Sequence, residues 1–195
     1  MPELPDLTVY LEHIERRLLG ERLEAIRLAS PFLLRTVEPT IEEVTGRRLT
    51  GTRRLAKQLV LCLEDNFYLV IHLMISGRLQ WRDAGAGIPK RLGLAAFDFE
   101  SGSLLFTEAS KKKRASLKIV HGEQDLAALN PGGLEVLEIS LGDFAECITH
   151  SNHTLKRALT DQHVFAGIGN AYSDEILLRA QLSPFKRPAN LSDTE

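Results

Sequence analysis

The sequence predicts an α+β fold in which an N-terminal β-sandwich with a leading helix is followed by a helical domain. Three observations lead to this prediction. An amphipathic helical segment opens the chain, eight short strand-like segments follow it, and three helical stretches lie beyond residue 130. Closely spaced short strands favour a sandwich. Strands followed by helices are typical of α+β proteins or of two separate domains.

The leading helix is expected over residues 5–19. Apolar residues recur at helical spacing from Leu7 to Leu18, as they do in a helix that buries one face. Pro5 suits the first helical turn, and Gly20 favours the end of the helix.

Eight segments rich in branched and aromatic residues, separated by turn-forming residues, are expected to be strands. They are Leu23–Ala29, Arg48–Arg54, Gln58–Leu63, Phe67–Met74, Arg78–Trp81, Leu92–Phe99, Ser103–Thr107 and Ala115–Val120. The segment 83–90 contains glycines and a proline and is expected to be an exposed loop.

The character of the sequence changes after Val120. The run Asn130-Pro131-Gly132-Gly133 is a strong break, and helices are expected at 141–149, 154–161 and 170–181. We therefore expect two domains, residues 1–122 and residues 123–195. Residues 191–195 resemble the capped start of a further helix, so we expect the chain to be a fragment of a longer protein.

Composition narrows the possible functions. With 44% hydrophobic residues and a net charge of −2, the chain is neither a disordered protein nor a uniformly basic nucleic-acid binder. Residues 47–120, however, carry 14 basic and 6 acidic side chains, whereas both flanks are net acidic. This asymmetry indicates either an anionic partner for the central region or a solvated basic face.

Cysteine content and hydropathy favour a cytoplasmic protein. Cys62 and Cys147 are too few for a disulfide scaffold, and reduced thiols are typical of the cytosol. No apolar run reaches the ~18 residues of a membrane span, and the acidic N-terminus does not resemble a signal peptide. We expect no membrane partner and no metal in this chain, because Cys147, His150 and His153 offer only three ligands.

The first residues suggest a nucleophile. Removal of Met1 would leave Pro2 with a free secondary amine, and an α-amino group has a pKa near ~7.7–8, so much of it is neutral at pH 7. Such an amine can attack a carbonyl-equivalent carbon and form a cationic iminium, and Glu3 beside it can move protons. The alternative is that Met1-Pro2-Glu3 only leads into the helix.

Four motifs carry a resemblance to a known family. They are Pro2-Glu3-Leu4-Pro5-Asp6, Arg53-Arg54-Leu55-Ala56-Lys57-Gln58-Leu59, His72-Leu73-Met74-Ile75-Ser76-Gly77-Arg78-Leu79 and Gly167-Ile168-Gly169-Asn170-Ala171-Tyr172-Ser173-Asp174-Glu175-Ile176-Leu177. In this order and spacing they resemble the formamidopyrimidine-DNA glycosylase/endonuclease VIII family. The resemblance implies that the C-terminal helical part is a helix–two-turn–helix domain.

The resemblance also implies roles for individual residues. Pro2 would attack C1′ of the damaged nucleotide, Glu3 would help to open the sugar, and Lys57 would contact a phosphate near the reacting sugar. Lys156 would grip the DNA backbone. Asn170, with Gly169 before it, would hold a phosphate at the start of a helix.

The sequence departs from the family at several positions. Asp6 replaces a usual Glu, and Ile75 stands where many members place a Met that fills the gap left by an everted base. The loop Glu108–Arg114 replaces a family loop whose Arg and Phe probe the opposite base. Its Lys111, Lys112, Lys113 and Arg114 are expected to bind phosphates, with a solvated turn as the alternative. The family's zinc-finger hairpin, with its structural zinc, would lie beyond Glu195.

The expected function is therefore removal of oxidised bases from damaged double-stranded DNA, followed by cleavage at the abasic site, by a monomer in the bacterial cytosol or nucleoid. Two alternatives remain. One is a catalytically weak DNA-binding paralogue or fragment, and the other is a non-enzymatic RNA- or ribosome-associated protein.

Overall fold

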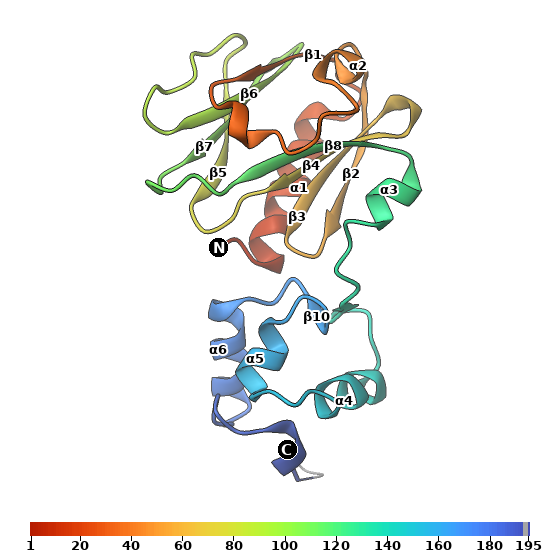
Figure 1. Cartoon of the computed structure of the whole chain (residues 1–195), viewed down its shortest axis with the longest axis vertical. Helices are drawn as coiled ribbons and strands as arrows, with labels where there is room; N and C mark the ends of the chain where they lie inside the picture. Colours follow the sequence, from red (N-terminus) through yellow and green to blue (C-terminus); the bar gives the residue numbers. More distant parts are fainter. Residues whose placement is uncertain (193–194) are drawn as a thin grey trace. The chain divides into compact units, whose positions relative to one another are not determined.

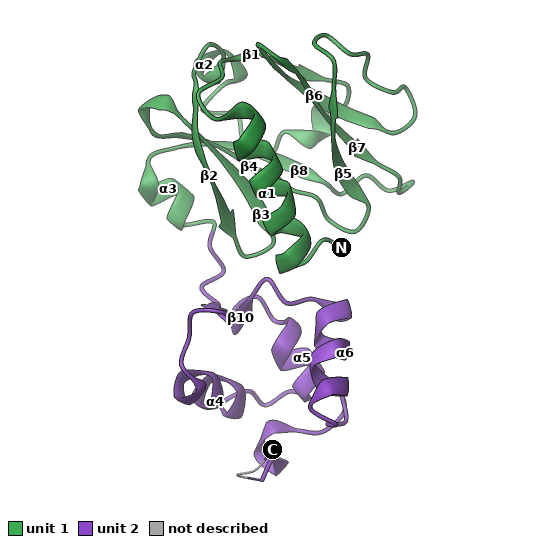
Figure 2. Cartoon of the chain, turned by 180° about the vertical axis from the view of Figure 1, so that it is seen from behind, with its two compact units in different colours: residues 1–129 green, residues 130–195 purple. Residues whose placement is uncertain are grey.

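A computed structural model describes residues 1–192 and 195 of the chain. They form two compact units, Met1–Leu129 and Asn130–Glu195 (Figure 2). Each unit has a hydrophobic core of its own. No helix among the described residues is long and apolar enough to cross a membrane.

Helix α1 (Leu4–Leu18) opens the first unit, as the sequence predicts. Pro5 lies in its first turn, and a capping box joins Glu3 to Asp6 at its start. This arrangement satisfies backbone N–H groups that a helix start otherwise leaves without partners. The helix buries Leu7 and Leu18 in the core.

Eight antiparallel strands form two four-stranded sheets, which confirms the predicted sandwich (Figure 1). The first sheet has the order β1 (Leu23–Leu28), β6 (Gly93–Phe99), β7 (Gly102–Glu108) and β5 (Gly77–Arg82). The second has the order β2 (Leu49–Leu55), β3 (Gln58–Leu63), β4 (Phe67–His72) and β8 (Ser116–His121). Two short helical segments, η1 (Pro31–Leu33) and α2 (Ile41–Val44), lie between β1 and β2, and a third, η2 (Glu64–Asn66), lies between β3 and β4.

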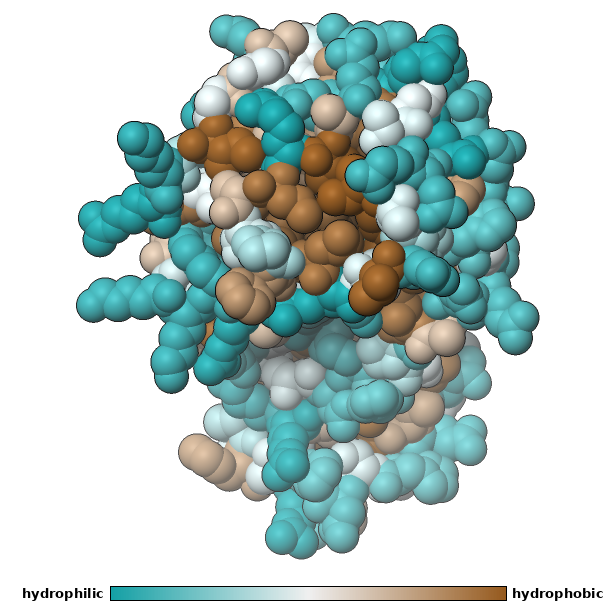
Figure 3. All heavy atoms as spheres, turned by 45° about the horizontal axis from the view of Figure 1, so that its top comes forward, coloured by the Kyte–Doolittle hydropathy of each residue, from teal (hydrophilic) through white to brown (hydrophobic). Residues whose placement is uncertain are grey.

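The main core lies between the sheets and contains Phe97 and Phe106 from one sheet and Leu61 and Leu69 from the other. Strands β3 and β4 are buried on both faces, so their sequences read as continuous apolar runs rather than as an alternation. On the surface of the first unit, hydrophobic side chains gather in one area that hydrophilic ones surround (Figure 3).

Helix α3 (Glu123–Ala127) covers the outer face of the second sheet. Leu126 is buried in a cluster with Tyr68 and Val70, and the Glu123 carboxylate accepts a hydrogen bond of 2.6 Å from the Tyr68 hydroxyl. It also forms an ion pair of 2.8 Å with Arg53. These contacts hold α3 in the first unit, so the observed division follows Leu129 and not residue 122, where the change in sequence pattern places it.

The second unit is helical. Its elements are β9 (Leu134–Glu135), α4 (Leu141–Thr149), α5 (Leu155–Thr160), β10 (Phe165–Ala166), α6 (Asn170–Arg179) and η3 (Pro188–Asn190). The core includes Leu159, Phe165 and Leu177, and Phe144 stacks on Phe165 with ring centroids 4.8 Å apart. The parallel pairing of β9 with β10 has no counterpart in the sequence prediction. Of the expected helix start at 191–195, residues 193–194 lie outside the described residues.

Candidate functional site

The N-terminal candidates lie at the start of α1. Pro2 is buried, and the Glu3 side chain is only 4% exposed. The backbone N–H of Glu3 donates a hydrogen bond of 3.0 Å to Asp6 Oδ2, and the Glu3 side chain accepts the Asp6 backbone N–H in return. Asp6, shorter than the family's Glu, therefore holds the backbone that presents Pro2 and Glu3.

Lys57 lies in the turn between β2 and β3, directly after Ala56, whose φ of 49° belongs to the left-handed region. This turn folds the lysine inward, and its side chain is 5% exposed. Burial lowers the pKa of the Lys57 ammonium, and the negative charge of Glu3 acts in the opposite direction. The fold therefore brings Glu3 and Lys57, which are distant in sequence, close enough for their charges to interact.

His72 belongs to the same neighbourhood, although its apolar strand suggests a core histidine. Its ring is half-buried, and Nδ1 accepts a hydrogen bond of 3.0 Å from the Met74 backbone N–H. Burial first, and then the positive charges of Lys57 and Lys118, lower the pKa of the imidazole. A neutral ring that accepts at Nδ1 carries its proton on Nε2, so His72 retains one N–H donor. In the sequence, His72 stands two residues before Met74, where the turn begins.

The turn after β4 and the loop after β7 lie together. Ile75 is 64% exposed, and Lys111, Lys112 and Arg114 are exposed in the loop. These residues line a groove of about 500 Å³. Two hydrogen bonds join the segments, from the Ser110 N–H to Ser76 Oγ at 3.1 Å and from the Ala109 N–H to the Ser76 carbonyl at 3.4 Å. Four predicted DNA-binding residues thus share one surface of the first unit.

Lys113 differs from its neighbours. Its ammonium donates a hydrogen bond to the main-chain carbonyl of Glu108, and it does not line the groove. Its charge is therefore directed toward the base of the loop.

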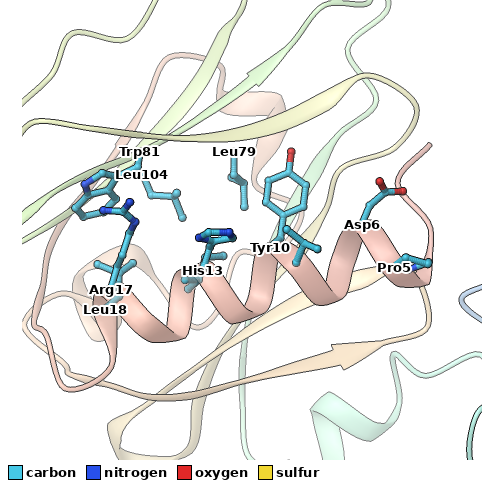
Figure 4. Close-up of a pocket in the computed structure, with 11 residues that line it drawn as sticks. Pro5, Asp6, Tyr10, His13, Arg17, Leu18, Leu79, Trp81 and Leu104 are labelled. Atoms are coloured by element: carbon cyan, nitrogen blue, oxygen red, sulfur yellow. The ribbon is translucent and has the colours of Figure 1, made fainter.

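A second groove, of about 550 Å³, separates α1 from β5 (Figure 4). Leu79 and Leu104 form an apolar lining, and the Arg17 guanidinium lies 5.8 Å from the centre of the Trp81 ring. Asp6 lines one end. This groove contains none of the predicted catalytic residues.

In the second unit, α6 begins at Asn170 after a glycine-rich turn. Gly167 has φ of 89°, a conformation that side chains disfavour, and Gly169 is the N-cap. Gln162 holds this turn from both sides, since Oε1 accepts the Gly167 N–H at 2.9 Å and Nε2 donates to the Ile168 carbonyl at 2.8 Å. Sequence reasoning missed Gln162, because nothing in its local pattern marks it.

Lys156 lies on α5, facing α6. Its ammonium binds both carboxylate oxygens of Asp174, at 2.6 and 2.7 Å. Lys156, Arg157 and Asn170 line one hollow of about 440 Å³. The fold therefore brings Lys156 and Asn170 together, as the predicted phosphate site requires, but it pairs the lysine with a carboxylate.

The first unit has the buried carboxyl group of Glu3 and the buried amino group of Lys57 near the N-terminus. It also has the cationic groove that Ile75 lines. The second unit offers a helix N-terminus and cationic side chains. Helix N-termini and lysines bind phosphate groups.

Comparison with known proteins identifies the family. The model of the formamidopyrimidine-DNA glycosylase N-terminal domain matches residues 1–117, and that of the formamidopyrimidine-DNA glycosylase H2TH domain matches residues 135–195. The formamidopyrimidine-DNA glycosylase of Roseiflexus sp. (strain RS-1) is 32% identical over 200 residues, covering 100% of this chain and 72% of the relative. That of Mycoplasma genitalium is 25% identical over 189 residues, covering 94% of this chain and 66% of the relative.

The fold is also similar to that of a solved structure. A crystal structure of the complex between Lactococcus lactis Fpg and DNA containing an abasic site matches with a TM-score of 0.89 at 26% identity. The match covers 98% of this chain and 73% of that chain. Because the two family models together cover most of its residues, the chain belongs to the formamidopyrimidine-DNA glycosylase family.

Proposed function

We propose that this chain acts in base-excision repair as a DNA glycosylase with abasic-site lyase activity, with damaged double-stranded DNA as its substrate. The observation that carries the proposal is the set of charged side chains around Pro2. The residue next to it is a buried carboxylate, Glu3, which Asp6 caps and which interacts with the buried ammonium of Lys57.

The nucleophile is the nitrogen of Pro2 once Met1 has been removed. While Met1 is attached, this nitrogen belongs to an amide and cannot attack. As a free α-amine it has a pKa near ~7.7–8 and is partly neutral at physiological pH. It forms a bond to C1′ of the flipped nucleotide and loses its proton, while the bond from C1′ to the base breaks and the base leaves with a proton.

Strand cleavage follows from the same intermediate. Glu3, having taken up the proton that Pro2 lost, delivers it to O4′ as the C1′–O4′ bond opens, which leaves an iminium between Pro2 and C1′. The iminium acidifies C2′, so loss of a C2′ proton expels the phosphate attached at C3′. Water then hydrolyses the iminium and restores the amine. Lys57 places positive charge near the phosphates of the reacting nucleotide.

The remaining predicted residues hold the DNA. Ile75 occupies the space that the flipped nucleotide leaves, and Lys111, Lys112 and Arg114 bind phosphates beside it. Lys156, Gly169 and Asn170 form a second phosphate site in the second unit. No step here depends on the structural zinc that the resemblance implies. The proposal includes a monomer and a cytosolic location.

Borohydride trapping tests the proposal. Borohydride reduces an iminium to a stable amine, so protein without Met1 should become covalently attached to a duplex containing an abasic site. The matched control carries one extra residue before Pro2 and should give no adduct while still binding the duplex. An equal adduct from the control would remove Pro2 from the mechanism. DNA binding without any adduct would favour the catalytically inactive DNA-binding alternative.

A further inference from the structure

Glu108 is a buried carboxylate directly before the basic loop. Its side chain is 1% exposed at the end of β7. Its oxygens accept the backbone N–H of Arg114, at 2.9 Å from Oε2 and 3.2 Å from Oε1, and the backbone N–H of Ala115, at 3.2 Å from Oε2. A buried carboxylate requires such partners, because burial without them is costly.

The same residue holds the loop from a second side. The Lys113 ammonium donates to the main-chain carbonyl of Glu108, so side chain and backbone of one residue bind the far end of the loop. The near end is bound to Ser76 through the N–H groups of Ala109 and Ser110. Loop 109–115 is therefore held closed by Glu108 and docked onto the turn that carries Ile75.

This arrangement is not explained by charge. A carboxylate within a loop of four cations lowers the positive charge that attracts phosphate, so Glu108 opposes anion binding electrostatically. Its contribution is geometric, because a loop ordered during folding does not have to be ordered on binding.

We propose that Glu108 is a positioning residue for DNA binding, which holds loop 109–115 so that Lys111, Lys112 and Arg114 face phosphates along the groove beside Ile75. This inference rests on the proposed function, because it requires that the loop contacts DNA.

An electrostatic role and a positioning role for Glu108 predict opposite changes in DNA affinity when the residue is replaced. Glu108→Ala removes a negative charge near the DNA, so a purely electrostatic role predicts tighter binding. The positioning role predicts weaker binding to a duplex with a tetrahydrofuran abasic-site analogue, measured by fluorescence anisotropy. Glu108→Gln, which keeps one acceptor oxygen, should lie between Glu108→Ala and the unchanged protein.

Coupling between substitutions separates positioning from loss of structure. One phosphate contact is worth about eightfold in affinity at ~0.1 M salt, from the counterion slope. Lys111→Ala should therefore weaken binding about eightfold in the unchanged protein and less than about threefold in Glu108→Ala. Lys156→Ala, in the other unit, should cost the same in both backgrounds. An equal Lys111→Ala effect in both backgrounds, or tighter binding by Glu108→Ala, overturns the inference.

If the variants do not fold, hydrogen exchange on the unchanged protein still tests the inference. The amides of Arg114 and Ala115 should be protected without DNA, because Glu108 accepts their hydrogen bonds. Exchange at the rate of an unprotected amide overturns the inference. Failure of the unchanged protein to bind the duplex contradicts the proposed function, whereas binding that depends on Lys111 without coupling to Glu108 contradicts only the inference.

Discussion

The ion pair between Lys156 and Asp174 predicts that a single substitution should tighten DNA binding. For Lys156 to bind a phosphate, its ammonium must leave the carboxylate that now holds it at 2.6 Å. Asp174→Asn weakens this hold and removes a negative charge from α6. We therefore expect higher affinity for DNA and slightly lower stability of the fold.

Because Lys156 and Asp174 are partly exposed to solvent, breaking their ion pair should change stability and DNA affinity only slightly. The side chain of Lys156 is 34% exposed and that of Asp174 is 58% exposed, and ion pairs of this kind contribute about 0–1 kcal/mol. Asp174→Asn should thus lower the free energy of unfolding by no more than about 1 kcal/mol. If the same energy no longer opposes binding, affinity for DNA should rise by up to about fivefold.

Fluorescence anisotropy with abasic-site DNA measures the affinity, and urea denaturation measures the stability. Glu175→Gln is the matched control, because it removes an exposed carboxylate from the next position of α6 without breaking an ion pair with Lys156. The gain should also disappear in Lys156→Ala. Equal effects of Asp174→Asn and Glu175→Gln, or a gain that persists without Lys156, would refute the reasoning.

Three further predictions concern the two units separately. Lys57→Met should weaken DNA binding about eightfold at ~0.1 M salt and lower the salt slope by about one contact; thermal denaturation should show a higher Tm, because the buried charge is gone. In NMR titration, His72 should titrate below its ordinary pKa, since burial and Lys57 disfavour its charged form, and its midpoint should rise in Lys57→Met. The unfolded chain then protonates His72 at higher pH than the folded chain, so this residue's contribution to stability falls as pH drops below about 6.5; a midpoint unchanged in Lys57→Met contradicts the placement. Gly167→Ala should lower the free energy of unfolding by about 1 kcal/mol or more, because φ is positive there, whereas Gly142→Ala in α4 should be neutral or stabilising by up to about 1 kcal/mol; equal urea midpoints for the two variants would contradict this assignment.

Features of this protein whose cause is local can be predicted from the sequence. Helix α1 follows from its apolar spacing and from Pro5 in its first turn, and the strands follow from short branched segments between turns. The glycine-rich turn before Asn170 can be predicted because Gly167 and Gly169 lie within three residues of the helix start. In each case the residues that interact lie within a few positions of one another, so their pattern is readable without the fold.

Interactions between residues that are distant in the sequence depend on the tertiary structure. Helix α3 joined the first unit because Glu123 meets Tyr68 and Arg53 across the second sheet. No spacing in the sequence brings Lys57 beside Glu3 and His72, or Lys156 onto Asp174. These pairs arise because strand order and helix packing place side chains together, and the protein's interior then changes their charges and partners. The catalytic candidates were therefore readable from sequence, whereas the groups that hold and tune them were set by packing.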